Sequence, residues 1–120
     1  MKTVVIIDDN EFVVKLADTP IKRIEGMQKQ RFDDNFNGML FLMPKVSNCF
    51  WMKDCLIPLD IIFIKDNIIT KIFESCPPCF IDEDCTNYCG RGSIVLEVFG
   101  GTCKKLNIKK GDRVKYNLRF

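Results

Sequence analysis

Residues 59–73 have the sequence LDIIFIKDNIITKIF, in which two isoleucine-rich runs flank Asp66-Asn67. Two turn-forming residues between β-branched runs predict a β-hairpin with strands Leu59–Lys65 and Ile68–Phe73. A second hairpin is predicted nearer the amino terminus, where Val4–Ile7 and Glu11–Leu16 flank a polar Asp8-Asp9-Asn10 turn. Both pairs indicate that the chain builds a β-sheet.

Working outward from these hairpins, we expect further strands at Gly38–Leu42, Cys49–Met52, Ile94–Phe99 and Arg113–Phe120. Strands at this spacing, with no long helices between them, favour a sandwich or a barrel over a fold of alternating strands and helices. A chain of 120 residues has the length of one domain, so residues 1–120 are expected to form a single mainly β domain.

One short helix is predicted near the amino terminus. Asp18 or Thr19 can cap it, and Pro20 suits the first helical turn because its missing N–H would have no partner there. Ile21, Ile24 and Met27 would form its apolar face, and it should end near Gln30. A shorter helical turn is expected at Thr102–Leu106.

Charge and hydropathy exclude several classes of partner. Eighteen basic and sixteen acidic residues give a net charge of +2 with no long block of either sign, so nucleic acid is not an expected partner. No run approaches the roughly 20 apolar residues of a membrane span, and the first residues do not resemble a secretory signal. These features predict a cytoplasmic protein with no membrane partner. Thirteen lysines against five arginines, with fourteen isoleucines, indicate an AT-rich genome.

Four of the seven cysteines fall within fourteen residues, forming a cysteine-rich loop of Cys76, Cys79, Cys85 and Cys89. Spacings of two, five and three residues approach those of a zinc knuckle, so zinc is a candidate cofactor, with Gly90 and Gly92 allowing tight turns. Three acidic residues between the cysteine pairs oppose this, because metal binding requires thiolates. The alternatives are a dithiol redox site, two small disulfides, or a surface loop without catalytic function.

Two carboxylates interrupt apolar strands. Asp60 lies within the run 57–64 and Glu97 within 94–99, and a buried charge is costly unless it is paired or serves a site. If the two converge, they could share a proton in acid–base chemistry, or bind a cation or sugar hydroxyls. The alternative is that each faces solvent or accepts backbone hydrogen bonds.

Trp51, the only tryptophan, lies beside Lys53 and Asp54. Period-two alternation places Trp51 and Lys53 on one face of a strand and Phe50 and Met52 on the other, so the indole could line a ligand groove with an ammonium nearby. The alternative is a core tryptophan beside a lysine whose head group reaches solvent.

Enzyme chemistry has little support. The chain has no histidine, which removes the commonest general base and every Ser-His or Cys-His pair. It also lacks a glycine-rich phosphate loop. A hydrolase would have to rest on carboxylates alone.

Motifs along nearly the whole chain resemble the domain of unknown function 192 family, in this order: LADTP (16–20), Arg23, Gly26, GMLF (38–41), Pro44, FWMK (50–53), IPLDIIFI (57–64), PPC (77–79), VLEV (95–98), Gly101 and Gly111-Asp112. The resemblance implies a compact, mainly β sandwich or barrel and no particular activity. Many family members resemble exported proteins with signal peptides, unlike the expectation for this chain.

The chain departs from the family pattern at two points. Asp54-Cys55 stands where the family commonly has Asn-Thr, and Gln30 stands where it often has arginine. Cys79 and Cys85 resemble a pair seen in some members, whereas Cys76 and Cys89 resemble additions.

These observations together predict a small non-catalytic binding or accessory domain for an unidentified small molecule or protein. Its candidate ligand-binding residues are Trp51, Lys53, Asp54, Asp60 and Glu97. One alternative is an interaction module stabilised by zinc at the four cysteines. The other is a carboxylate-dependent hydrolase acting on a glycan-like substrate.

Overall fold

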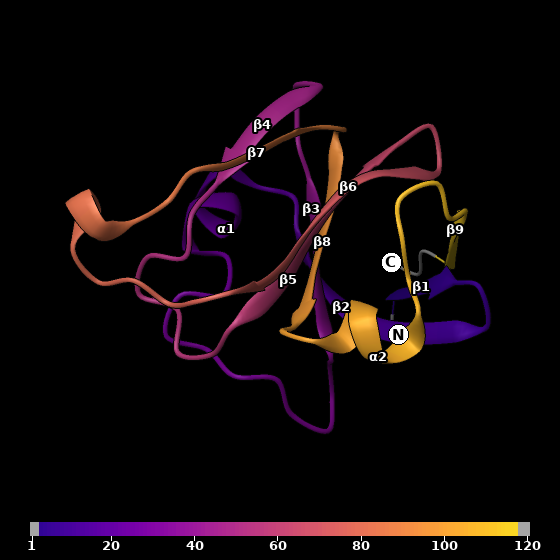
Figure 1. Cartoon of the computed structure of the whole chain (residues 1–120), viewed down its shortest axis with the longest axis horizontal. Coiled ribbons are helices and arrows are strands. Elements are labelled where there is room, and N and C mark those ends of the chain that lie inside the picture. Colours follow the sequence, from indigo (N-terminus) through magenta and orange to yellow (C-terminus); the bar gives the residue numbers. More distant parts are fainter. Residues whose placement is uncertain (1–2, 118–120) are drawn as a thin grey trace.

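A seven-stranded sheet in the order β6-β5-β8-β3-β2-β1-β9 dominates the computed structural model, which describes residues 3–117. A separate two-stranded ribbon, β4-β7, lies beside it (Figure 1). The strands are β1 (Thr3–Ile7), β2 (Asn10–Ala17), β3 (Gly38–Leu42), β4 (Ser47–Phe50), β5 (Leu59–Lys65), β6 (Ile68–Cys76), β7 (Tyr88–Arg91), β8 (Ile94–Phe99) and β9 (Val114–Asn117). Three short helices, α1 (Pro20–Glu25), η1 (Asp82–Asp84) and α2 (Thr102–Leu106), complete the described elements. The prediction of a mainly β fold is confirmed.

Both predicted hairpins form. β5 and β6 pair antiparallel around Asp66 and Asn67, whose φ angles of 53° and 63° are both left-handed. Two consecutive left-handed residues match the type I′ turn, whose twist suits paired strands. The β1-β2 hairpin likewise turns at Asp8, with φ 54°.

The sheet curls into a half-barrel rather than a flat layer. Its two outermost strands approach each other where Ile68 forms a bridge with Arg113. The Ile69 N–H donates to the Asp112 carbonyl at 3.0 Å, and the Val114 N–H donates to the Asn67 carbonyl at 2.8 Å. The predicted strand at residues 113–120 is therefore present as β9, and its last three residues lie outside the described part of the chain.

The helix α1 is shorter than predicted. Thr19 caps it by accepting from the Lys22 N–H, but the helix ends at Glu25 because Gly26 turns away with φ 46°. Ile21 and Ile24 are 68% and 74% exposed, so the predicted apolar face is wrong. With only six residues, the helix connects the parallel strands β2 and β3 without burying any side chain of its own.

Two apolar cores occupy the two faces of the sheet. Along β5, Ile62 and Ile64 belong to the first core, with Cys103 of α2, whereas Leu59, Ile61 and Phe63 belong to the second. Because strand side chains alternate between faces, strands buried on both sides are apolar almost throughout. The register of β5 and β8 therefore decides which face each polar residue in these strands meets.

The β4-β7 ribbon covers part of the second core. The predicted strand at Cys49–Met52 begins and ends two residues earlier, as β4, and its partner β7 was not predicted. Gly90 is needed here because a Cβ at that position would lie 2.6 Å from the Phe63 ring. Gly92, with φ 150°, would meet the Ile64 carbonyl at 2.3 Å. These glycines let the ribbon approach β5, which replaces the metal-binding turns expected from the sequence.

No helix within residues 3–117 has the length and apolar character needed to cross a membrane.

Candidate functional site

A mainly apolar cavity of about 310 Å³ opens between α1, the end of β4 and the turn at residues 51–55. Its walls include Met27, Phe41, Phe50 and Trp51, and Glu97 also lines it. A volume of this size is at the lower end of the range for small-molecule sites. We call this cavity the Glu97 pocket.

Strand register carries Glu97 into the pocket. Glu97 of β8 pairs with Met39 of β3 on one side and with Ile61 of β5 on the other. Directly opposed residues in an antiparallel pair point to the same face, so Glu97 faces the second core together with these apolar neighbours. Its side chain comes from the middle of the sheet, where backbone hydrogen bonds on both sides restrict movement.

The Glu97 carboxyl group has no protein partner. The residue is only 3% exposed, and within residues 3–117 no hydrogen bond or ion pair reaches its carboxyl oxygens. These oxygens are not among the fully enclosed unpaired atoms, so they face accessible space. Desolvation by burial raises the pKa of Glu97 to about 8, since an isolated charge is costly away from water. At neutral pH Glu97 is therefore a largely protonated acid.

The aromatic wall is built by close packing. The Phe41 and Phe50 rings meet edge to face with centroids 4.9 Å apart, and Phe50 meets Phe63 in the same way at 5.9 Å. Gly26 brings the end of α1 onto this wall, because a Cβ there would lie 3.1 Å from the Phe41 ring. The glycine thus ends the helix and leaves room beside Phe41.

Arg23 attaches α1 to the sheet at the edge of the pocket. Its Nε donates to the Leu42 carbonyl at 2.7 Å, and its Nη2 donates to the Asp18 carbonyl at 3.2 Å. Two of the five guanidinium N–H groups therefore donate to backbone acceptors. It holds the helix in place rather than neutralising Glu97, whose pKa responds to burial alone.

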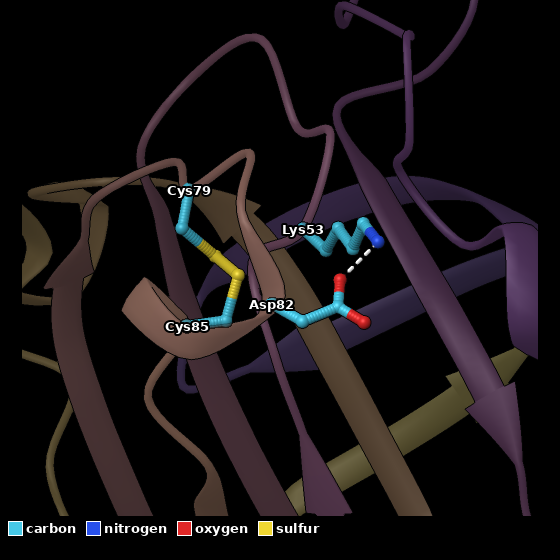
Figure 2. The surroundings of a disulfide bond; sticks show 4 residues. All are labelled: Lys53, Cys79, Asp82 and Cys85. Atoms are coloured by element: carbon cyan, nitrogen blue, oxygen red, sulfur yellow. Dashed lines mark hydrogen bonds and ion pairs between the residues drawn. A yellow bond between two sulfur atoms is a disulfide. The ribbon is translucent and has the colours of Figure 1, made fainter.

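Trp51 lies at the mouth of the pocket and is 41% exposed. The Lys53 Nζ lies 5.5 Å from the centroid of the indole ring, and Lys53 also forms an ion pair with Asp82 (Figure 2). The Asp82 hydrogen bond is the main cause of a raised pKa at Lys53. Trp51 and Lys53 are thus neighbours, as predicted, although the chain is no longer a strand at these positions.

Asp54 occupies a tight turn behind this rim, with φ 58°. Its N–H donates to the Cys79 carbonyl and its carbonyl accepts from the Lys29 N–H, both at 2.8 Å. Asp54 does not line the Glu97 pocket. Asp54 therefore shapes the turn through its backbone.

Asp60 is buried on the opposite face of the sheet. Its Oδ1 accepts from the N–H groups of Ser75 at 2.7 Å and Gly101 at 3.0 Å, and its Oδ2 accepts from the Cys103 N–H at 2.8 Å. Because Asp60 pairs with Val98 and Glu97 pairs with Ile61, the two carboxylates point to opposite faces. The predicted carboxylate pair does not form, and Asp60 takes the alternative role of accepting backbone hydrogen bonds.

The predicted zinc cluster is replaced by two disulfides. Cys79 bonds to Cys85, closing the loop before β7 (Figure 2), and Cys89 bonds to Cys49 across the β4-β7 ribbon. Cys76 is buried and unpaired, and desolvation raises the pKa of its thiol to about 11. The zinc prediction is corrected because its spacings did not include Cys49, which lies 40 residues before its partner.

The sequence pattern indicated Glu97 and Trp51 but not the residues that line the pocket around them. Met27 was expected on the helix, Phe41 was noted only within a family motif, and Cys55 only as a departure from the family pattern. All three line the pocket. The signal that was available is Glu97 itself, a charged residue in an otherwise apolar strand.

A second, larger hollow of about 430 Å³ lies on another side of α1. The charged residues that line it, among them Lys15, Asp18 and Lys22, are exposed. Exposed charged groups of this kind are solvated by water. This hollow consequently has no buried polar group that requires a ligand, and the Glu97 pocket is the better candidate.

One family model matches almost the whole chain. The family model DUF192, described as "Uncharacterized ACR, COG1430", matches residues 3–116. Among curated proteins none matches the chain.

Two solved structures share the fold. One is a protein from Sinorhizobium meliloti 1021 described as a "putative transcription regulator", with 30% identity, a TM-score of 0.80, and coverage of 96% of this chain and 92% of that one. The other, from Novosphingobium aromaticivorans DSM 12444, is described as a protein of unknown function. It has 31% identity, a TM-score of 0.77, and coverage of 95% of this chain and 83% of that one.

Proposed function

The chain belongs to the DUF192 family, whose description names no reaction, and we propose that it is a non-catalytic binding module whose ligand occupies the Glu97 pocket. The ligand is a small molecule with an apolar body and one polar group that pairs with the Glu97 carboxyl group. Trp51 covers the mouth of the pocket, and Arg23 and Gly26 hold α1 against it.

The unpartnered carboxyl group of Glu97 carries this proposal. Burying a polar group without a hydrogen bond costs roughly 1–3 kcal/mol, and the cost rises when the group is charged. Asp60, equally buried in a neighbouring strand, receives three backbone N–H groups. Glu97 receives none and lies in a cavity, which supports a partner from outside the chain.

The groups around Glu97 favour binding over catalysis. Desolvation raises the pKa of the Cys55 thiol to about 12, so this cysteine stays protonated and is a poor nucleophile. A carboxylate-dependent hydrolase needs two carboxylates flanking one bond. Asp60, the partner expected from the sequence, is on the other face of the sheet and cannot serve as the second. Glu25 at the pocket edge is exposed to solvent rather than buried beside Glu97.

Occupation of the pocket can be measured by NMR with the methionine methyl groups as probes. Met27 and Met43 both line the cavity. We expect their methyl signals to shift on titration with at least one of three compounds of equal shape: benzylammonium, benzyl alcohol or benzoate. The same titration of Glu74→Gln, a change at an exposed strand position, should give the wild-type result. If none of the three shifts these signals at millimolar concentration, the proposed site is wrong.

We also infer that the protein works in an oxidising compartment, in place of the predicted cytoplasmic location. Two disulfides support this inference, because glutathione and thioredoxin keep most cytoplasmic thiols reduced. Protein trapped from its own cells with an alkylating agent and then unfolded should react at three of its seven cysteines. Reaction at all seven cysteines would contradict this inference and favour the cytoplasmic location.

A further inference from the structure

We propose that the ligand of the Glu97 pocket is an organic cation, a protonated amine on an apolar or aromatic body, with the Glu97 carboxylate as its counter-ion. This inference rests on the proposed function of the same pocket. It adds the charge of the ligand, which the pocket's surroundings determine.

Within residues 3–117 no basic side chain forms an ion pair with Glu97. Its neighbours in β3 and β5, Met39 and Ile61, are uncharged. From α1, Arg23 lines the pocket but donates to two backbone carbonyl groups, and Glu25 is a further acid at the pocket edge.

The thiols near Glu97 do not supply a counter-charge either. Cys55, in the turn at the pocket, and Cys76, at the end of β6, both have their pKa values raised by burial, in part through the Glu97 charge. Both thiols are neutral at physiological pH. Lys53, 5.5 Å from the centroid of the Trp51 ring, forms its ion pair with Asp82. Among residues 3–117, the charged and titratable groups around the pocket thus leave the Glu97 carboxylate without an ion-pair partner.

The pocket walls also favour a positive ligand. Phe41, Phe50 and Trp51 line the cavity, and the face of an aromatic ring attracts cations through its quadrupole. The thioethers of Met27 and Met43 are polarisable and carry no positive charge. The oxygen of a carbonyl or carboxylate ligand would gain no such attraction from a ring face.

Proton linkage gives this assignment a distinctive signature. Glu97 is protonated below its raised pKa, so a cation must displace one proton from the carboxyl group as it binds. Its affinity should therefore rise about tenfold per pH unit below that pKa. A neutral ligand that accepts a hydrogen bond from the protonated acid should show constant affinity over that range and weaker binding above it.

The test measures the affinities of benzylammonium, benzyl alcohol and benzoate at pH 6, 7 and 8. The compounds share one ring and differ in charge. We expect benzylammonium to bind best, about tenfold more tightly at pH 7 than at pH 6, with release of close to one proton per ligand. Glu97→Gln should weaken benzylammonium by at least about tenfold, since an amide cannot balance the charge, while Glu74→Gln should match wild type.

The outcomes separate the two proposals. If benzyl alcohol or benzoate binds in the pocket and benzylammonium does not, or if Glu97→Gln leaves the affinity for benzylammonium unchanged, the cation assignment is wrong and the binding module stands. If none of the three binds, both proposals fail. The comparison of the three compounds uses the unmodified protein, so it decides the question even if Glu97→Gln folds poorly.

Discussion

Asp60 and Glu97 share a setting in the sequence but have opposite surroundings in the fold. Each interrupts an apolar strand near the middle of the sheet, and they are 0% and 3% exposed. On one face, Asp60 accepts three backbone hydrogen bonds that tie β6 and the start of α2 to β5. On the other, Glu97 faces a cavity without a partner. Burial alone therefore does not distinguish a carboxylate that stabilises the fold from one that faces a cavity without a partner, whereas the hydrogen bonds of each residue do.

Substitution of each carboxylate should give the largest difference in stability between the two positions. Asp60→Ala leaves three backbone N–H groups without an acceptor, and we expect a loss of about 3–5 kcal/mol in the free energy of unfolding. Asp60→Asn, which keeps one acceptor oxygen, should lie between this variant and wild type. Glu97→Leu should change stability by less than about 1 kcal/mol or increase it, because it removes a buried polar group without stranding another. Urea denaturation at pH 7 measures all three, and equal losses at the two positions would contradict the distinction.

Disulfide removal tests how the Glu97 face is held together. Cys49–Cys89 links residues 40 apart, and Cys49 lines the pocket, whereas Cys79–Cys85 spans six. Chain-entropy arguments give about 4 kcal/mol for the longer loop and about 2 kcal/mol for the shorter. The paired alanine variants should follow this order in urea midpoint. Loss of Cys49–Cys89 should also admit water to the pocket and lower the pKa of Glu97. A larger loss of stability from removing Cys79–Cys85 would show that the β4-β7 ribbon contributes little to the stability of the fold.

The pH dependence of the free energy of unfolding tests the burial of Glu97. Burial raises the pKa of Glu97 from 4.5 to about 8. Between these values the folded state keeps a proton that the unfolded state has released, so stability falls as pH rises through this window. The slope is at most about 1.4 kcal/mol per pH unit. Glu97→Gln should remove this component, which urea denaturation at pH 5.5, 6.5 and 7.5 would measure, and an unchanged slope would mean that Glu97 titrates normally.

The smallest expected effect on stability concerns the rim. Trp51→Ala removes a side chain that is 41% exposed, so the free energy of unfolding should change by about 1 kcal/mol or less. Affinity for benzylammonium should nevertheless fall severalfold, because a ring face beside the cation is lost. Trp51→Phe, which keeps an aromatic face, is the matched control. Unaltered affinity in the alanine variant would place the ligand away from the mouth.

Local patterns predicted the strands well and the site poorly. The type I′ turn at Asp66-Asn67 depends on two adjacent residues, so its sequence signal is sufficient. The zinc prediction failed because the partner of Cys89 is Cys49, outside the cluster, and only the pairing of β4 with β7 brings them together. The helix face at Ile21 and Ile24 failed because Gly26 ends α1 before it can pack.

Local sequence patterns were enough to predict a mainly β chain, the positions of its hairpin turns, and Asp60 and Glu97 as unusual residues within apolar strands. These properties follow from neighbouring residues and from alternation along single strands. Which carboxylate accepts backbone hydrogen bonds and which faces a cavity depends on the tertiary structure. Strand register assigns each to a face, and the N–H groups that satisfy Asp60 come from residues up to 43 positions away, a contact that no local pattern specifies.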